Sequence, residues 1–319
     1  MNIVVLDGHT LNPGDHSWDR VAALGDFTVY DRTSPASIIE RAQEADILLV
    51  NKAPLTAEII AQLPRLRFIS LLATGYDNVD VAAARQHGIP VSNVPEYATD
   101  AVAQHIFALL LELTNCVALH DAAVKAGEWT DAIDFSFWKT SIIELTGMKM
   151  GIVGFGRIGS RVAQIASAFG MELQAYNPRP KEVPGGIRVE WKDLDGLFAE
   201  ADVITLTTRQ TAENVEFVNR KLLSVMKKNA FFINTSRGNL VNERDLAEAL
   251  NSGTLAGAAV DVVSREPIRA DNPLLTARNC LITPHIAWAS FAARKRLMEQ
   301  TVRNVQAFIR GNPVNVVNP

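Results

Sequence analysis

Short apolar runs of strand type alternate along the chain with longer stretches of helical periodicity. In the first third the apolar runs occupy residues 3–6, 46–50, 68–72 and 89–91, and each ends in a polar or glycine-rich loop. This alternation is typical of parallel sheets whose strands are joined by crossover helices. The pattern predicts an α/β fold, and because such sheets bind ligands at the C-terminal ends of their strands, the loop residues Lys52, Thr74 and Gly75 are candidate ligand contacts.

A long helix is predicted over residues 99 to about 119. Its apolar positions cover most of its circumference, so we expect it to be buried on several sides. It could link two domains, and the loop over residues 129–138, with a tryptophan at each end, could form a dimer contact. The alternative is an ordinary core helix followed by a surface loop.

A second series of strands and helices follows and forms a full doubly wound sheet. Its six predicted strands lie at residues 148–153, 172–176, 203–206, 231–234, 258–260 and 281–282. Beyond them a helix is predicted over residues 291–309, ending at Gly311 with Pro313 as a stop signal. We expect this tail to pack on the first domain.

Composition agrees with two domains and narrows the function classes. The chain has 319 residues, 48% of them apolar, and 31 basic against 35 acidic residues leave a net charge of -4 without runs of one sign. Nothing in this pattern indicates a nucleic-acid partner. Residues 1–7 read as a strand rather than a signal peptide, and residues 102–119 carry too many polar side chains for a membrane span.

The two cysteines, Cys116 and Cys280, are far apart and form no metal-binding spacing. This usage is typical of a reducing compartment, and we expect a cytoplasmic protein without a metal site.

A dinucleotide-binding fingerprint opens the second series. Gly154, Gly156 and Gly159 form GxGxxG directly after an apolar strand and at the start of a helical pattern. The first glycine permits a tight turn, the second lets the backbone approach a pyrophosphate, and the third allows close helix packing. A glycine turn without a ligand is the less favoured alternative.

The acid that usually binds the ribose hydroxyls of NAD is missing. Asn177 occupies its place, and Arg179 follows two residues later. Arg179 could pair with a 2′-phosphate, and Arg209 could approach the same adenosine end. We therefore favour NADP(H) over NAD(H); in the alternative, Asn177 binds the hydroxyls of NAD and both arginines lie in solvent.

Three late loops carry polar residues that would meet at the carboxyl edge of the second sheet. Arg237 could bind a carboxylate through two parallel hydrogen bonds, while Glu266 and His285 follow the next two strands. Each residue alone would more often be structural or solvated.

In this order, the motifs resemble those of the D-isomer-specific 2-hydroxyacid dehydrogenases. The resemblance spans nearly the whole chain and includes residues 75–80, the fingerprint, residues 234–238, residues 259–262, Glu266-Pro267 and Thr283-Pro284-His285. Residues 6–8, Asn51-Lys52 and residues 285–288 are most similar to the glycerate dehydrogenase, or hydroxypyruvate reductase, group. The resemblance implies a Rossmann cofactor domain (99–286) inserted in a flavodoxin-like substrate domain (1–98 and 287–319), and a homodimer.

The resemblance also implies roles for the loop residues. Arg237 would orient the substrate carboxylate and carbonyl, and His285 would be the general acid and base. Glu266 would hold His285 and favour its imidazolium form. The backbone at Thr74 and Gly75 would take carboxylate oxygens, with Lys52 and Trp288 as further substrate contacts. The predicted cofactor contacts beyond the glycines are Arg157, Ile158, Thr207, Thr235 and Asp261.

The sequence departs from the family in two places, and other functions stay open. Residues 207–211 replace a His-x-Pro-Leu-Thr segment, and Gln104 stands where relatives often have glutamate, without a functional explanation. The expected reaction is reduction of hydroxypyruvate or glyoxylate to D-glycerate or glycolate. Alternatives are a phosphoglycerate or formate type of dehydrogenase, or a regulator that senses dinucleotides without catalysis.

Overall fold

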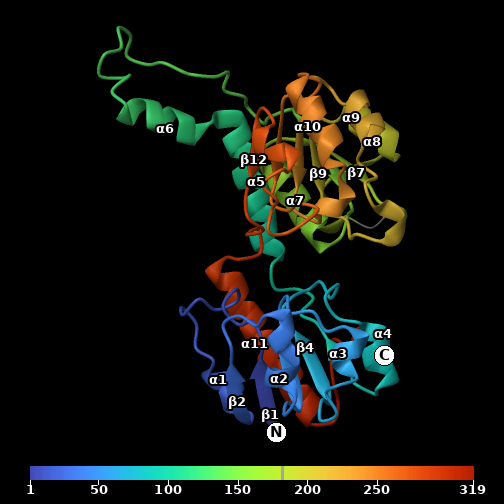
Figure 1. Cartoon of the computed structure of the whole chain (residues 1–319). Helices are drawn as coiled ribbons and strands as arrows, with labels where there is room; N and C mark the ends of the chain where they lie inside the picture. The colour runs from blue at the N-terminus through green and yellow to red at the C-terminus, as the bar shows by residue number, and fades with distance from the viewer. Residues whose placement is uncertain (181–182) are drawn as a thin grey trace. The chain divides into compact units, whose positions relative to one another are not determined.

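The computed structural model describes residues 1–180 and 183–319. Their chain divides into two compact units, coloured by residue number in Figure 1: unit 1 contains Met1–Ala98 and Ala289–Pro319, and unit 2 contains Thr99–Trp288. The second boundary therefore lies two residues beyond the expected one at 286/287. The roles assigned to the two parts of the chain stay predictions.

Unit 1 is built on a five-stranded parallel sheet. The strand order is β2-β1-β3-β4-β5, with β1 Asn2–Val5, β2 Asp26–Val29, β3 Ile47–Val50, β4 Phe68–Leu71 and β5 Val91–Ser92. This order is the flavodoxin-like one, and it reverses direction between β1 and β3. The connecting helices are α1 Asp19–Ala22, α2 Ile38–Ala42, α3 Ala57–Ile60 and α4 Val81–Gln86, with the 3₁₀ turn η1 Pro35–Ser37.

The C-terminal helix belongs to unit 1, as predicted. Helix α11, Phe291–Ile309, begins at Ser290, whose hydroxyl accepts a hydrogen bond from the backbone N–H of Ala293. It packs against β4, where the rings of Phe68 and Phe308 stack with centroids 4.5 Å apart. Residues 240 positions apart thus pack together in one core.

Unit 2 is built on a seven-stranded parallel sheet in the order β12-β11-β10-β9-β6-β7-β8. The strands are β6 Lys149–Val153, β7 Glu172–Tyr176, β8 Glu190–Trp191, β9 Val203–Leu206, β10 Phe231–Asn234, β11 Gly257–Val260 and β12 Cys280–Ile282. The order is that of the Rossmann fold with one strand added, and it reverses between β6 and β9. The predicted pair of doubly wound parallel sheets is confirmed, although β2 and β8 were not predicted.

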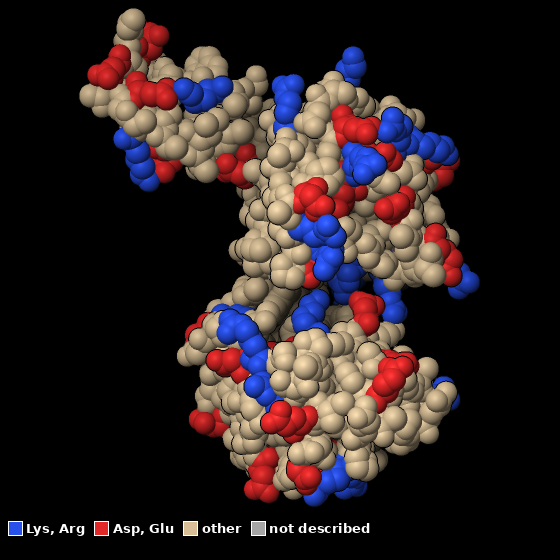
Figure 2. Space-filling model, viewed as in Figure 1, with Lys and Arg blue, Asp and Glu red and all other residues tan. Residues whose placement is uncertain are grey.

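Helices cover both faces of the second sheet. The helices of unit 2 are α5 Thr99–Asn115, α6 Val117–Lys125, α7 Arg157–Ala168, α8 Leu194–Glu200, α9 Arg220–Val225 and α10 Glu243–Asn251, and all but α6 lie against the sheet or its covering helices; the 3₁₀ turns are η2 Pro184–Gly186, η3 Ala212–Asn214, η4 Gly238–Leu240 and η5 Pro273–Thr276. The fully buried Phe198 and Phe232 lie in the core that α8, α9 and α10 form with the sheet. On the face seen in Figure 2, acidic and basic residues of the described chain are interspersed.

The prediction of a single long helix over residues 99 to about 119 is wrong. Cys116 takes a left-handed backbone conformation with φ 48°, which ends α5 and lets α6 start in a new direction. Burial on several sides holds for α5, which packs against α7, β10 and β11. It fails beyond the break, because Val117 is 63% exposed.

No single helix among the described residues is long and apolar enough to cross a membrane. Helices α5 and α6 reach the required length and apolar composition only when they are taken together, and the two helix axes are bent by 55° at the break between them.

Candidate active site

The glycine fingerprint lies at the point where the strand order of the second sheet reverses. It connects β6 to α7, and Gly154 has φ 96°, a conformation that favours glycine. A Cβ on Gly154 would overlap the backbone of Thr208, and one on Gly159 would overlap the carbonyl oxygen of Gly154. A Cβ on Gly156 would meet no atom of the described chain within 4 Å. Two glycines thus serve close packing, and the middle one leaves open space for a phosphate at the start of α7.

Side chains next to the fingerprint hold its loop in place. Phe155 donates its backbone N–H to Oδ1 of Asn177 at 3.2 Å, and Asn177 donates Nδ2–H to the carbonyl of Arg179 at 2.6 Å. Thr207 donates its hydroxyl to the Gly154 carbonyl at 2.5 Å. Asn177 therefore joins the fingerprint to the loop after β7, while the Arg179 side chain is exposed.

The loops with Arg237, Glu266 and His285 follow β10, β11 and β12, which are neighbours in the sheet. The first two loops pack tightly, because a Cβ on Gly238 would overlap the backbone of Val263. The predicted grouping of the three loops at one sheet edge is therefore present.

His285 and Glu266 are directly hydrogen-bonded. Nδ1 of His285 lies 2.7 Å from Oε2 of Glu266. Because an ionised carboxylate can only accept, Nδ1 carries the hydrogen in this bond, and Nε2 is the ring nitrogen that the bond does not use. The side chains of His285 and Glu266 are 24% and 33% exposed, so both are accessible to a small molecule.

Asp261 is a buried carboxylate beneath the His285 loop. It accepts the hydroxyl of Thr283 at 2.6 Å and the backbone N–H groups of Ile286 and Ala287, each at 2.8 Å. Burial alone would raise its pKa, but the hydrogen bonds from His105, Thr283 and the two backbone groups lower the pKa below its usual value. Asp261 is therefore ionised at neutral pH.

The buried hydroxyl oxygen of Thr235 has no hydrogen-bond partner among the described residues. An unsatisfied buried hydroxyl at the end of β10 is suited to a polar ligand group. Together with the open fingerprint loop, it fits a bound dinucleotide.

The substrate candidates Lys52, Thr74 and Gly75 lie in unit 1. Asp7 accepts the backbone N–H groups of Asn51, Lys52 and Ala53 at 2.7, 2.5 and 2.7 Å, which fixes the loop after β3 and leaves the Lys52 side chain exposed. Thr74 donates its hydroxyl to the carbonyl of Val94 at 2.7 Å.

Gly75 follows Thr74 in the same loop, and Trp288, half-buried, is the last residue of unit 2. The sequence analysis did not predict that Asp7 holds the loop after β3 through hydrogen bonds, although an acidic residue directly after the first strand could have indicated such a role.

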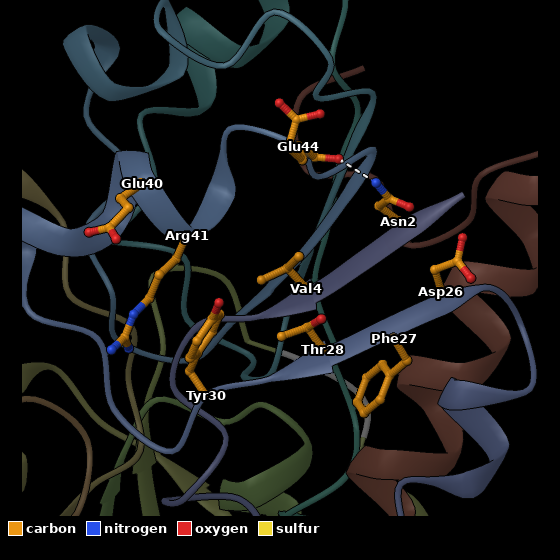
Figure 3. A pocket seen from close by; sticks show the side chains of 9 residues that line it. All are labelled: Asn2, Val4, Asp26, Phe27, Thr28, Tyr30, Glu40, Arg41 and Glu44. Atoms are coloured by element: carbon orange, nitrogen blue, oxygen red, sulfur yellow. Dashed lines mark hydrogen bonds between the residues drawn. The ribbon is translucent and has the colours of Figure 1, made fainter.

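A cavity of about 510 Å³ lies elsewhere in unit 1, beside β1, β2 and α2 (Figure 3). Arg41, one of the residues that line the cavity, has its guanidinium carbon 4.2 Å from the centroid of the Tyr30 ring and donates a hydrogen bond to the carbonyl of Arg32 at 2.7 Å. None of the predicted site residues lines this cavity, so it contributes nothing to the site.

Other reactive groups do not add to the site. No group of three or more His, Cys, Asp or Glu within the described ranges could hold a metal ion. Cys116 and Cys280 are free thiols, and burial raises the pKa of Cys280 to about 12, so its thiolate is absent at neutral pH.

Fold and site together define an NAD(P)-dependent oxidoreductase, and comparison with known proteins agrees. Residues 107–287 match the model of the "D-isomer specific 2-hydroxyacid dehydrogenase, NAD binding domain". A hydroxypyruvate reductase of Blautia hydrogenotrophica is 46% identical over 321 residues, covering 100% of both chains. A glycerate dehydrogenase of Methylorubrum extorquens is 38% identical, covering 92% of each.

Among solved structures, an acyclic imino acid reductase, Bsp5, in complex with NADPH and D-Arg has a TM-score of 0.88 and 31% identity, covering 99% of this chain and 100% of that one. The chain belongs to the D-isomer specific 2-hydroxyacid dehydrogenase family.

Proposed function

We propose that the protein reduces hydroxypyruvate or glyoxylate to D-glycerate or glycolate. The observation that carries this proposal is the hydrogen bond between Glu266 and His285, on loops of the sheet that also presents the dinucleotide fingerprint. The names of the two full-length relatives, which describe enzymes of hydroxypyruvate and glycerate, support the same substrate class.

In this proposal His285 moves the proton of the reaction. A nicotinamide cofactor, when bound, would supply the hydride for C2 of the keto acid. Nε2 of His285 donates a proton to the carbonyl oxygen, which becomes the hydroxyl group, and it takes that proton back in the reverse direction. Glu266 holds the ring through Nδ1 and favours its charged form.

Other loop residues bind and orient the substrate. Arg237 takes the carboxylate through two parallel hydrogen bonds, which aligns the carbonyl with His285. The backbone at Thr74 and Gly75 accommodates the remaining oxygens, with Lys52 and Trp288 as additional contacts. These assignments rest on the exposed loop positions of Lys52 and Thr74 and on the family to which the chain belongs.

The fingerprint glycines, Arg157 and Ile158 would hold the cofactor diphosphate at the start of α7. Thr207, Thr235 and Asp261 would lie toward the nicotinamide. We further propose a preference for NADPH, because Asn177 replaces the acid that would repel a 2′-phosphate and the side chain of Arg179 is exposed beside it. Arg209, in the loop after β9, stays a candidate second contact.

The proposed assembly is a homodimer formed through residues 117–147. Helix α6 and the loop after it extend away from the rest of unit 2 (Figure 1), and Ile133, Phe135 and Trp138 are 102%, 91% and 69% exposed. Apolar side chains gathered in this way mark an interaction site. A second copy of the chain offers the same surface, as a two-fold interface requires.

Sedimentation velocity tests the dimer. The unmodified chain should sediment as a dimer and the Phe135→Glu variant as a monomer, with Glu144→Gln as a control in the same segment. A monomer at micromolar concentration for the unmodified chain would contradict the proposal.

The predicted cytoplasmic location stays a prediction.

An initial-rate screen tests the reaction. Hydroxypyruvate, glyoxylate, pyruvate and an imino acid are compared, each with NADH and NADPH, and the absorbance of the reduced nicotinamide is followed. Hydroxypyruvate or glyoxylate should have the highest kcat/KM, and His285→Ala should lower kcat by about 10²–10⁴ without weakening NADPH binding. Fastest turnover of the imino acid would replace the proposed substrate, and turnover of none would favour a dinucleotide sensor.

A further inference from the structure

We propose that His105, on helix α5, is a positioning residue for His285 and acts through Thr283 and Asp261. This inference rests on the proposed function, because it concerns the residue that moves the proton. It assigns His105 a task that neither the fingerprint nor the three catalytic loops include.

Three side chains form a connected polar chain from α5 to the catalytic loop. Nε2 of His105 lies 3.1 Å from the hydroxyl oxygen of Thr283 and 3.5 Å from Oδ1 of Asp261. The Thr283 hydroxyl lies 2.6 Å from the same Oδ1. The Asp261 side chain is fully buried and that of His105 is 19% exposed, so water competes weakly for these contacts.

The direction of each hydrogen bond follows from counting hydrogens. Asp261 is ionised and can only accept, so the single hydroxyl hydrogen of Thr283 points to Asp261. The Thr283 oxygen must then accept from His105, which therefore carries its hydrogen on Nε2. His105 donates to Thr283, and Thr283 donates to Asp261.

Asp261 connects this series of hydrogen bonds to the backbone of the turn that contains His285. Its carboxylate binds the N–H groups of Ile286 and Ala287, and its carbonyl accepts the N–H of His285 at 2.8 Å. His285 itself has φ 57°, a left-handed conformation that is unfavourable for any residue with a Cβ. Hydrogen bonds on both sides of His285 hold the backbone in this conformation.

Helix α5 holds His105, the first residue of this hydrogen-bonded series, in a fixed position. It packs against α7, β10 and β11, and the neighbours of His105 on its buried face include Val102, Ile106 and Leu109. A donor fixed on this helix limits the movement of Thr283, and through it the movement of the carboxylate that shapes the turn. The catalytic ring is thereby held near the position that proton transfer requires.

Substitution of His105 tests the inference. His105→Leu removes the donor, whereas His105→Gln keeps an N–H at a similar reach. Gln104→Leu is the matched control, since Gln104 is the exposed neighbour on the same helix. The first readout uses no cofactor: ¹⁵N spectra of the six histidines follow the ring signals of His285 in the unliganded protein.

His105→Leu should displace the His285 ring signals, and His105 of the unmodified protein should carry hydrogen on Nε2. In steady-state assays with the best substrate, kcat should fall about ten- to a hundredfold with a nearly unchanged KM. His105→Gln should recover most of this loss, and Gln104→Leu should have no effect.

Thr283→Val provides a second route if His105→Leu does not fold. It should lower kcat in the same way. Where His105→Leu does fold, combining it with Thr283→Val should cost less than a further twofold, because both substitutions break the same series of hydrogen bonds. Unchanged His285 signals in His105→Leu, or failure of His105→Gln to recover kcat, would overturn the inference. Absence of keto-acid turnover in the unmodified protein would instead contradict the proposed function, because the spectra do not depend on it.

Discussion

Oε2 of Glu266 accepts a hydrogen bond from Nδ1 of His285 across 2.7 Å. The two residues lie 19 positions apart and follow neighbouring strands, β11 and β12. The bond occupies Nδ1 and places a negative charge next to the imidazole. This geometry makes the pH dependence of the reaction a direct test of the site.

Glu266→Gln should shift the reduction profile to lower pH. The glutamine keeps a hydrogen-bond acceptor but removes the charge that favours the imidazolium needed as the acid. The measurement is kcat/KM for keto-acid reduction between pH 5 and 9, with Glu299→Gln on α11 as a control. An unchanged profile would mean that the carboxylate does not influence the proton on His285.

Arg237→Lys should behave as a damaging substitution although the charge is kept. A lysine ammonium is a point charge and cannot form two parallel hydrogen bonds with a carboxylate. We expect kcat/KM for the keto acid to fall roughly ten- to a hundredfold, from the loss of one charge-assisted hydrogen bond. Arg20→Lys, on the exposed face of α1, is the control, and full activity of Arg237→Lys would transfer the anchoring role to Lys52.

Arg179→Ala should reduce the preference for NADPH. A charge-assisted contact with the 2′-phosphate contributes about 1.5–3 kcal/mol, so the unmodified protein should favour NADPH roughly tenfold or more in kcat/KM. The variant should lose this ratio mainly through slower use of NADPH, and Arg310→Ala should leave it unchanged. Equal or better use of NADH by the unmodified protein would rule out a phosphate site at Arg179.

Asp15→Asn should destabilise unit 1 only above acidic pH. Asp15 accepts two hydrogen bonds from Arg294 at 2.5 and 2.6 Å, and this guanidinium lowers the pKa of Asp15 below 3.8. Because the folded-state pKa is depressed, the stabilisation is present above 3.8 and disappears as pH falls through the folded value.

Thermal unfolding measured at pH 7 and at a series of lower pH values below 3.8 follows this difference. The Asp15→Asn variant should melt below the unmodified protein at pH 7, and the difference should shrink as the pH falls below 3.8, with Asp31→Asn as an exposed control. A difference that persists unchanged at low pH would show that the lost contact is not ionic.

Strand prediction succeeded where both faces of a strand are buried. The strands β3 and β4 are fully buried and read as continuous apolar runs, as central strands of a parallel sheet must. The missed strands, β2 and β8, lie at sheet edges and are mostly exposed or only two residues long. Their pairing depends on a neighbouring strand and leaves little pattern in the chain.

The sequence by itself determined the α/β class and the dinucleotide fingerprint and singled out Arg237, Glu266 and His285 as candidates, because residue types and their order after predicted strands carry that information. Only the tertiary structure decided that Cys116 ends α5, since a left-handed residue there has no local signal.

It also decided what surrounds His285. The buried carboxylate of Asp261 lies 22 to 26 positions from the residues whose hydrogen bonds it accepts. Thr283 joins this carboxylate to the ring of His105, which is 178 positions from Thr283. Hydrogen bonds over such separations arise from the packing of α5 against the sheet, and no pattern of neighbouring residues encodes them.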